Sequence, residues 1–273
     1  MQDLYPTHIF LGPDKTGSSW LFNTLLAHPE AFVPPAKDLY YFDKYYSRGA
    51  KWYTGHFSRS YGYKAVVDIS HDYLMSSQAP KRIKQDLPEA KCFVFARNPV
   101  ERSISHYQYL RKSGIINCGF IDAIKIRPDI ISNSLYSHHL SKYEHEFGES
   151  IKVLNFEDLK SNPEKFASEV FSYLGISYIG DSIAGKERAA SEPRSYYLSK
   201  AIKNSALLAR DIGLENLIGH IKNSDLVNSI LYKKLPRSYG KSLKDEYSVY
   251  LLDNYFGNEI EIMQEKYYIN LGS

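Results

Sequence analysis

The segment His8–Leu21, with the sequence HIFLGPDKTGSSWL, joins a strand, a glycine loop and a helix, and the predicted fold follows from it. The apolar run His8–Gly12 predicts the strand. Apolar residues recur at helical spacing over Ser18–His28, which predicts a helix that ends before a proline. Two glycines, five residues apart, bound the loop between them. Because the N–H groups and the dipole at a helix N-terminus attract anions, we expect this loop to bind one.

Apolar segments and helical patterns continue to alternate along the chain. Further strands and helices are predicted at Lys64–Ile69, Gln78–Asp86, Cys92–Ala96, from Asn98 onward, at Ile151–Phe156 and at Asn162–Leu174. Unbroken apolar strands separated by helices are typical of a parallel sheet that is covered on both faces. We therefore predict an α/β fold, with a P-loop-like parallel sheet over about residues 8–180 and helices on both of its faces. Residues from about 193 to 273 are predicted to be mostly helical, and the whole chain to be a single domain.

The charge of the chain is nearly balanced, with 34 Lys and Arg against 31 Asp and Glu, a net charge of +3. This balance does not suit a protein that coats nucleic acid, but it allows one basic pocket. The start of the chain lacks the basic and apolar regions of a signal peptide, and no run reaches the ~18 apolar residues needed to cross a bilayer. With only two cysteines, the chain is expected to be cytoplasmic and without a membrane span, unless an anchor lies outside it. Its oligomeric state is left open.

The residues of the glycine loop separate two classes of nucleotide enzyme. In the G-x-x-x-x-G-K-[ST] motif of nucleotide triphosphate enzymes, a lysine follows the second glycine. Here Ser18 occupies that position, and the lysine of the loop is Lys15. A kinase-like enzyme that uses magnesium remains an alternative, with Asp68 at the end of an apolar run as the metal ligand.

The loop resembles the 5′-phosphosulfate loop of sulfotransferases, the enzymes that use 3′-phosphoadenosine 5′-phosphosulfate (PAPS). In that family a lysine precedes a Gly-Thr/Ser-Thr/Ser step that opens the first helix. The resemblance implies PAPS as donor, 3′-phosphoadenosine 5′-phosphate (PAP) as product and no metal. The sequence itself also has no Cys and His cluster with the spacing of metal ligands. It implies donor contacts from Lys15, Thr16, Gly17, Ser18, Ser19 and Trp20.

A second element of the same family lies about eighty residues further on. There a strand ends in arginine, the next helix carries serine eight positions later, and both bind the 3′-phosphate of PAPS. Arg97 and Ser105 stand at these positions, and Ser105 shares a helix face with Arg102 by its spacing. The guanidinium of Arg97 can donate two hydrogen bonds to one phosphate. Arg194 is a further candidate for contact with the donor's phosphates.

Other stretches resemble carbohydrate sulfotransferases, including the heparan sulfate group, and bacterial sulfotransferases. They are Asp38–Phe57, similar to an E-x-x-F-F-D run, Asp68–Tyr73, similar to E-K-S-P-x-Y, Ser134–Leu140, similar to G-x-Y-x-x-x-L, and Ile151–Ile176. The resemblance implies a hydroxyl acceptor, less often an amine, on a glycan or a small molecule. The aromatic residues of Tyr40–Tyr53 either line an acceptor cleft or pack in the core.

Two residues are candidates for the base that takes the acceptor's proton. Asp38 stands where the resembled carbohydrate enzymes carry a glutamate base. A free aspartate has a pKa near ~4, so Asp38 needs burial or a like-charged neighbour, for which Asp43 is the candidate. Ile69 replaces the lysine and His71 the proline of E-K-S-P, and the pKa of an imidazole, near ~6.5, suits a base. The predicted catalytic residues are thus Lys15, Asp38 and His71, and a non-catalytic module of the same fold is the second alternative.

Overall fold

The computed structural model describes residues 4–180, 191–193, 205, 232–234 and 238–272. The chain divides into two compact units. The first comprises Met1–Asn98, Leu135–Lys186 and Asn258–Ser273, and the second comprises Pro99–Ser134 and Glu187–Gly257. That the chain is a single domain stays a prediction.

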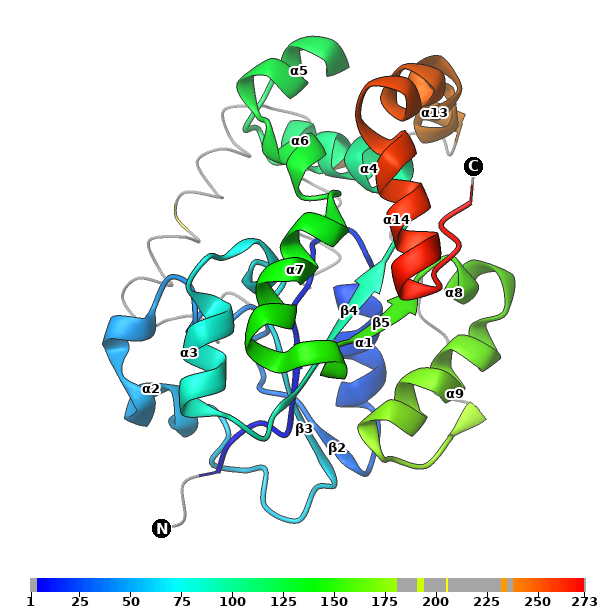
Figure 1. Ribbon diagram of the computed structural model, residues 1–273. Coiled ribbons are helices and arrows are strands. Elements are labelled where there is room, and N and C mark those ends of the chain that lie inside the picture. The colour runs from blue at the N-terminus through cyan, green and yellow to red at the C-terminus, as the bar shows by residue number, and fades with distance from the viewer. Residues whose placement is uncertain (1–3, 181–190, 194–204, 206–231, 235–237, 273) are drawn as a thin grey trace. The chain divides into compact units, whose positions relative to one another are not determined.

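The first unit is built on a five-stranded sheet with the order β2-β3-β1-β4-β5, in which every pairing is parallel (Figure 1). The strands are β1 His8–Phe10, β2 Ala31–Phe32, β3 Ala65–Ile69, β4 Lys91–Ala96 and β5 Lys152–Asn155. His8 pairs with both Val67 and Lys91, so the carboxyl ends of the three central strands meet at one edge of the sheet. The predicted parallel sheet is confirmed, and ligands bind at this edge in open α/β folds.

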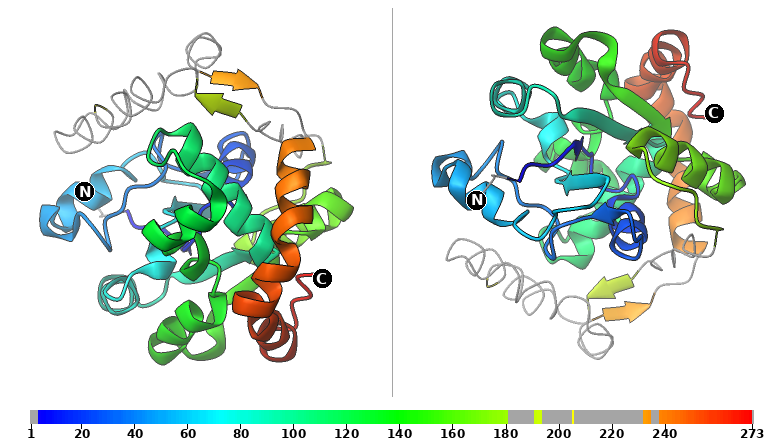
Figure 2. Two further views of the ribbon diagram at one scale, coloured as in Figure 1. Left: turned by 90° about the horizontal axis from the view of Figure 1, so that it is seen from above. Right: turned by 90° about the horizontal axis from the view of Figure 1, so that it is seen from below.

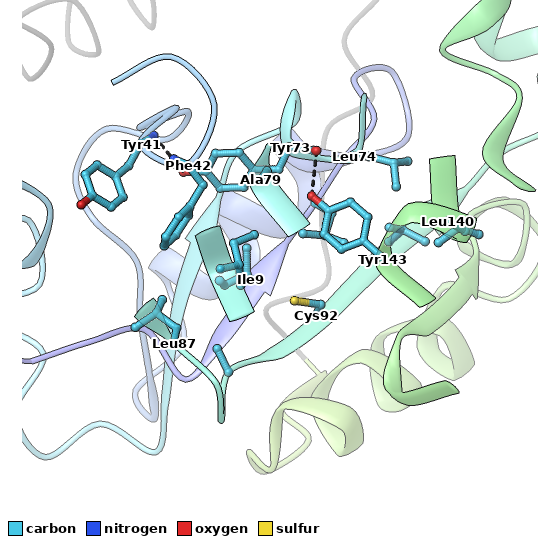
Figure 3. Close-up of a cluster of buried hydrophobic side chains, with 14 of the residues drawn as sticks. Ile9, Tyr41, Phe42, Tyr73, Leu74, Ala79, Leu87, Cys92, Leu140 and Tyr143 are labelled. Carbon is cyan, nitrogen blue, oxygen red and sulfur yellow. Dashed lines mark hydrogen bonds between the residues drawn. The ribbon is translucent and has the colours of Figure 1, made fainter. Parts of the chain in front are cut away.

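Helices cover both faces of this sheet. Successive strand residues point to opposite sides, so these apolar strands present an apolar surface on each face that helices bury. Ile9 and Cys92 face a cluster that contains residues of helices α3 (Ala79–Asp86) and α7 (Tyr136–Phe147). Phe10 and Phe93 face a second cluster, with residues of α1 (Ser18–Leu26) and α9 (Pro163–Leu174). The first cluster also encloses a polar contact, in which the Tyr143 hydroxyl donates to the Tyr73 carbonyl at 2.7 Å (Figure 3). The predicted covering of both faces is confirmed.

Shorter elements complete the first unit. They are the turns η1 Tyr46–Arg48, η2 Tyr73–Met75 and η3 Gly148–Ser150, and the helices α2 Ala50–Gly55 and α8 Asp158–Ser161. Helix α14, Gly257–Tyr267, begins at the last residue of the second unit and continues in the first.

The second unit is mostly helical. Its helices are α4 Pro99–Lys112, α5 Phe120–Ile126, α6 Asp129–Ser132 and α13 Ser238–Leu251, which continues into the π-helical turn η5 Leu252–Phe256. Strands β6 (Ser191–Pro193) and β7 (Tyr232–Lys234) pair antiparallel, as the yellow-green and orange arrows of Figure 2 show. The prediction of a largely helical C-terminal third is confirmed by α13 and α14, whereas the pairing of β6 with β7 was not predicted.

Arg102 corrects the predicted polar face of α4. Its side chain is fully buried, and its Nη1 donates to the carbonyls of Asp129 and Ile130 at 3.4 and 3.3 Å. A guanidinium can be buried when its donors meet carbonyl oxygens. Arg102 therefore joins α4 to α6 within the second unit, and it does not accompany Ser105 on an exposed surface.

Candidate active site

The loop between β1 and α1 is a tightly curled turn. Gly12, Lys15 and Gly17 have positive φ angles of 112°, 68° and 103°. A Cβ on Gly12 would lie 2.1 Å from the carbonyl oxygen of His71, and one on Gly17 would lie 2.3 Å from Cε2 of Phe156. Both positions therefore require glycine, for backbone conformation and for space. The loop is held between the His71 backbone on one side and the Phe156 ring on the other.

Hydroxyl groups of the loop divide into two kinds. Thr16 is buried, and its Oγ1 donates to the Pro13 carbonyl at 2.7 Å, so its hydroxyl braces the loop, while its contact with the donor stays a prediction. The Ser18 and Ser19 hydroxyls accept hydrogen bonds from Nζ of Lys37 at 3.3 and 3.1 Å. Lys37 was not among the predicted residues, and it adds a second cation beside Lys15.

The first turn of α1 presents backbone N–H groups. Gly17 is its N-cap residue and makes no side-chain capping bond, so an anion can take the place of a cap. Trp20 contributes only its backbone here, because its ring packs in the core, 5.2 Å from the ring of Phe166.

Arg97 lies against the same loop. Its Nη1 donates to the Lys15 carbonyl at 3.0 Å, and its guanidinium lies 5.7 Å from the centre of the Phe156 ring. The buried hydroxyl of Tyr136, on α7, accepts from the Arg97 N–H at 3.2 Å and donates to the Arg97 carbonyl at 2.8 Å. Tyr136 therefore holds the backbone of Arg97 in place. This supporting role was not predicted, although Tyr136 is the tyrosine of the stretch that resembles G-x-Y-x-x-x-L.

Of the other two predicted phosphate contacts, Ser105 is described by the structure and Arg194 is not. Ser105 is half-buried on α4, in the second unit, so its joint action with Arg97 stays a prediction. Arg194 lies outside the described residues.

The two candidate bases, Asp38 and His71, form one hydrogen-bonded pair. Asp38 Oδ1 lies 2.6 Å from Nδ1 of His71. On the other side of the ring, Nε2 of His71 lies 3.2 Å from the Tyr40 hydroxyl and 3.2 Å from Oδ1 of Asp72. Asp38 has a positive φ of 64°, and its N–H donates to the Ile69 carbonyl at 2.8 Å. The pair is thereby anchored to the carboxyl end of β3, next to the loop.

Acidic neighbours control the charge of His71. Burial by itself lowers the pKa of this imidazole, but the carboxylates of Asp38, Asp72 and Asp14 act against burial and raise its pKa above the ordinary value. The imidazolium form is therefore more favoured at His71 than in a free histidine. With carboxylates at both ring nitrogens, His71 is suited to position Asp38 rather than to accept a proton itself.

Asp68 is a buried carboxylate that interacts with Asp38. Burial raises the pKa of Asp68 to about 6, and the charge of Asp38 contributes to this rise. Burial also raises the pKa of Asp43 to about 6, but there the acidic neighbour is Asp72. Hydroxyls of Tyr53, Tyr73 and Ser70 donate to Asp68 at 2.9, 3.0 and 2.9 Å.

Part of the aromatic stretch packs in the core, whereas Tyr40 lies beside His71. Tyr41 and Tyr53 are buried and stacked, with 4.4 Å between ring centres. A cavity of about 360 Å³ beside them is lined by Tyr5 and Leu87 among others. Because Tyr5 precedes β1 and Leu87 precedes β4, this cavity opens at the amino ends of the strands, away from the glycine loop.

The described residues contain neither a candidate metal site nor a candidate membrane span. No three His, Cys, Asp or Glu side chains in them gather as a possible set of metal ligands. None of the helices in the described ranges has the length and apolar character needed to cross a membrane.

Comparison with known proteins gives consistent matches. The model of the sulfotransferase domain family matches residues 6–199. Membrane-associated sulfotransferase kil1 of Dictyostelium discoideum is 30% identical over 146 residues, which is 50% of this chain and 31% of kil1. Heparan sulfate glucosamine 3-O-sulfotransferase 6 of Mus musculus is 27% identical over 186 residues, which is 64% of this chain and 54% of that protein. The chain thus spans only about a third to a half of these relatives.

A solved structure shows the same fold. The crystal structure of a sulfotransferase from Alicyclobacillus acidocaldarius matches with a TM-score of 0.60 and 22% identity, covering 80% of this chain and 96% of that one. At this level of identity the match concerns the fold alone.

Proposed function

The chain belongs to the sulfotransferase family, and from this premise we propose that it transfers a sulfuryl group from PAPS to an acceptor hydroxyl, less often an amine. The observation that carries the proposal is the junction of three elements at one edge of the sheet. The helix N-terminus with Lys15, the guanidinium of Arg97 and the Asp38–His71 pair all meet the Leu11–Gly17 loop.

In the proposed reaction, Lys15 and the first-turn N–H groups of α1 stabilise the leaving group, which is the 5′-phosphate of PAPS. In the proposed step, the acceptor oxygen forms a bond to sulfur while the bond from sulfur to the 5′-phosphate oxygen breaks. Negative charge grows on that phosphate oxygen, and fixed donors and a cation next to it lower the barrier. In this proposal Arg97, which is held by Tyr136 and by the Lys15 carbonyl, binds the 3′-phosphate and so fixes the donor.

Asp38 takes the acceptor's proton in this proposal. Its Oδ1 is hydrogen-bonded to the His71 ring, and in the proposed step its Oδ2 accepts the proton as the sulfuryl group arrives. His71 is a positioning residue that holds the carboxylate in one orientation. Asp38 is one methylene shorter than glutamate, so its side chain reaches less far. Its contacts with the Ile69 carbonyl and with His71, whose carbonyl lies against Gly12, hold it beside the loop.

A carbohydrate or glycan is the proposed class of acceptor. Its support is that relatives include heparan sulfate sulfotransferases, which match over 64% of this chain. The kinase-like alternative is less well supported, because the carboxylate of Asp68 is buried among three hydroxyls and is not presented as a magnesium ligand.

Thermal denaturation with PAPS, PAP, 5′-AMP or ATP with magnesium tests the donor. We expect PAP and PAPS to stabilise the protein by about 2.7 kcal/mol relative to the unliganded chain at a hundredfold excess over Kd, and 5′-AMP at the same concentration to stabilise it less. Arg97→Ala should abolish the preference for PAP over 5′-AMP. Stabilisation by ATP with magnesium but not by PAP would favour a kinase-like enzyme. Binding of PAP without sulfation of any unsulfated glycan or simple alcohol would favour a binding module.

A further inference from the structure

Position 69 marks where this chain departs from the carbohydrate sulfotransferases that it resembles. They carry a lysine there, in E-K-S-P, whereas this chain has Ile69. The side chain of Ile69 is 2% exposed and packs in the apolar cluster beneath α1 and α9. Strand β3 therefore supplies no cation to the site from this position.

Lys37 approaches the same place from a different segment. The N–H of the next residue, Asp38, donates to the carbonyl of Ile69 at 2.8 Å, so the Lys37–Asp38 peptide lies beside the end of β3. From there the Lys37 side chain extends to the first turn of α1. Its Nζ lies 3.3 Å from the Ser18 hydroxyl and 3.1 Å from the Ser19 hydroxyl.

The partners of Lys37 leave its charge available to an anion. Lys44 and Lys64 of the first unit are, by contrast, paired with the carboxylates of Asp72 and Glu30. Among the described residues, the side-chain contacts of Lys37 are two hydroxyls and no carboxylate. A hydroxyl that accepts a bond from an ammonium group still has its own proton to donate to another acceptor.

We propose that Lys37 supplies the second cation of the site, in place of the lysine missing at position 69, and binds the sulfuryl group of PAPS together with the Ser18 and Ser19 hydroxyls. The inference rests on the proposed function and assigns a ligand group to each cation. Lys15 serves the bridging and 5′-phosphate oxygens, whereas Lys37 serves the sulfuryl oxygens. Lys37 is then a specificity residue that distinguishes PAPS from PAP, which has no sulfuryl group.

Affinities of PAPS and PAP for three variants test this assignment. Isothermal titration of Lys37→Met should show PAPS binding weakened at least ~10-fold, as one lost charged contact predicts, with PAP binding nearly unchanged. Lys37→Arg should recover part of the PAPS affinity. The matched control Lys64→Met removes an exposed lysine paired with Glu30, and should change neither affinity.

The outcomes separate this inference from the proposed function. If the wild-type chain binds PAP and PAPS but Lys37→Met weakens both equally, or neither, the role of Lys37 is wrong while the proposed function stands. If the wild-type chain binds neither nucleotide, both are wrong. Melting temperatures of the variants show whether any loss comes from misfolding.

Discussion

Replacement of Gly12 by alanine tests whether the loop is held against the His71 backbone. Alanine at a φ of +112° carries a backbone cost of about 1–2 kcal/mol. The new Cβ would also lie 2.1 Å from the His71 carbonyl oxygen, and a backbone atom cannot swing aside. Overpacking of this kind costs about 1–3 kcal/mol, so we expect Gly12→Ala to destabilise the chain by roughly 3 kcal/mol in total.

Two other glycines provide a graded comparison. A Cβ on Gly17 would meet the Phe156 ring at 2.3 Å, and a ring can rotate, so the steric part should be only about 0.5–1.5 kcal/mol. Gly62 has a φ of +86° and nothing within 4 Å of its Cβ, so Gly62→Ala should show the backbone cost alone. The gain from a less flexible unfolded chain is common to all three variants and cancels between them.

Urea denaturation measures the three free energies of unfolding, and transfer assays follow the site. We expect the order Gly12→Ala, Gly17→Ala, Gly62→Ala, from most to least destabilised. Only the first two should lose sulfuryl transfer, because only they displace the loop. Equal destabilisation by all three variants would show that the close approach of Gly12 to His71 is wrong.

Three further predictions concern the site itself. Lys15→Ala should lower kcat by about 10²–10³, the effect of one lost oxyanion donor, with an unchanged melting temperature; turnover like the wild type would contradict its role. Tyr136→Phe leaves the N–H and carbonyl of Arg97 without their hydroxyl, so it should cost about 1–3 kcal/mol of stability and weaken PAP binding, as denaturation and titration would show. The pKa of His71 is raised, so its ion pair with Asp38 stabilises the fold fully below pH ~6.5 and is lost as pH rises through the higher pKa of the folded state. We therefore expect kcat of the wild type to fall as pH rises through the pKa of His71, and kcat of His71→Gln to show no such fall. A rise in the kcat of the wild type over the same pH range would identify His71 as the base.

The framework of the site could be predicted from sequence because local patterns determine it. The strand at Cys92–Ala96 is an apolar run, and Pro99 is at the first position of the helix that follows. Both elements therefore form where their residues favour them. Since parallel strands end at a common edge, the order of elements already placed Lys15 and Arg97 together, and the bond from Arg97 to the Lys15 carbonyl confirms this.

Contacts between distant segments could not be predicted in the same way. Lys37 and Ser19 are 18 residues apart, and their contact depends on how the segment before Asp38 docks on β3. The pairing of Asp38 with His71 likewise spans 33 residues and follows from a positive φ at an aspartate, which no spacing rule indicates. The bond from the Thr16 hydroxyl to the Pro13 carbonyl was likewise not predicted, and the donor contact expected of Thr16 stays a prediction.

The position of Lys37 and Asp38 as neighbours in the chain has a mechanistic consequence. One side chain reaches the hydroxyls at the start of α1, and the other reaches His71, so a single peptide connects the cation proposed for the sulfuryl group with the proposed base. The bond from the Asp38 N–H to the Ile69 carbonyl sets both at once. In-line transfer requires the base and the sulfuryl group to be aligned on one acceptor oxygen. A segment that carries both groups sets the separation between the proposed base and the cation proposed for the sulfuryl group, and so contributes to that alignment.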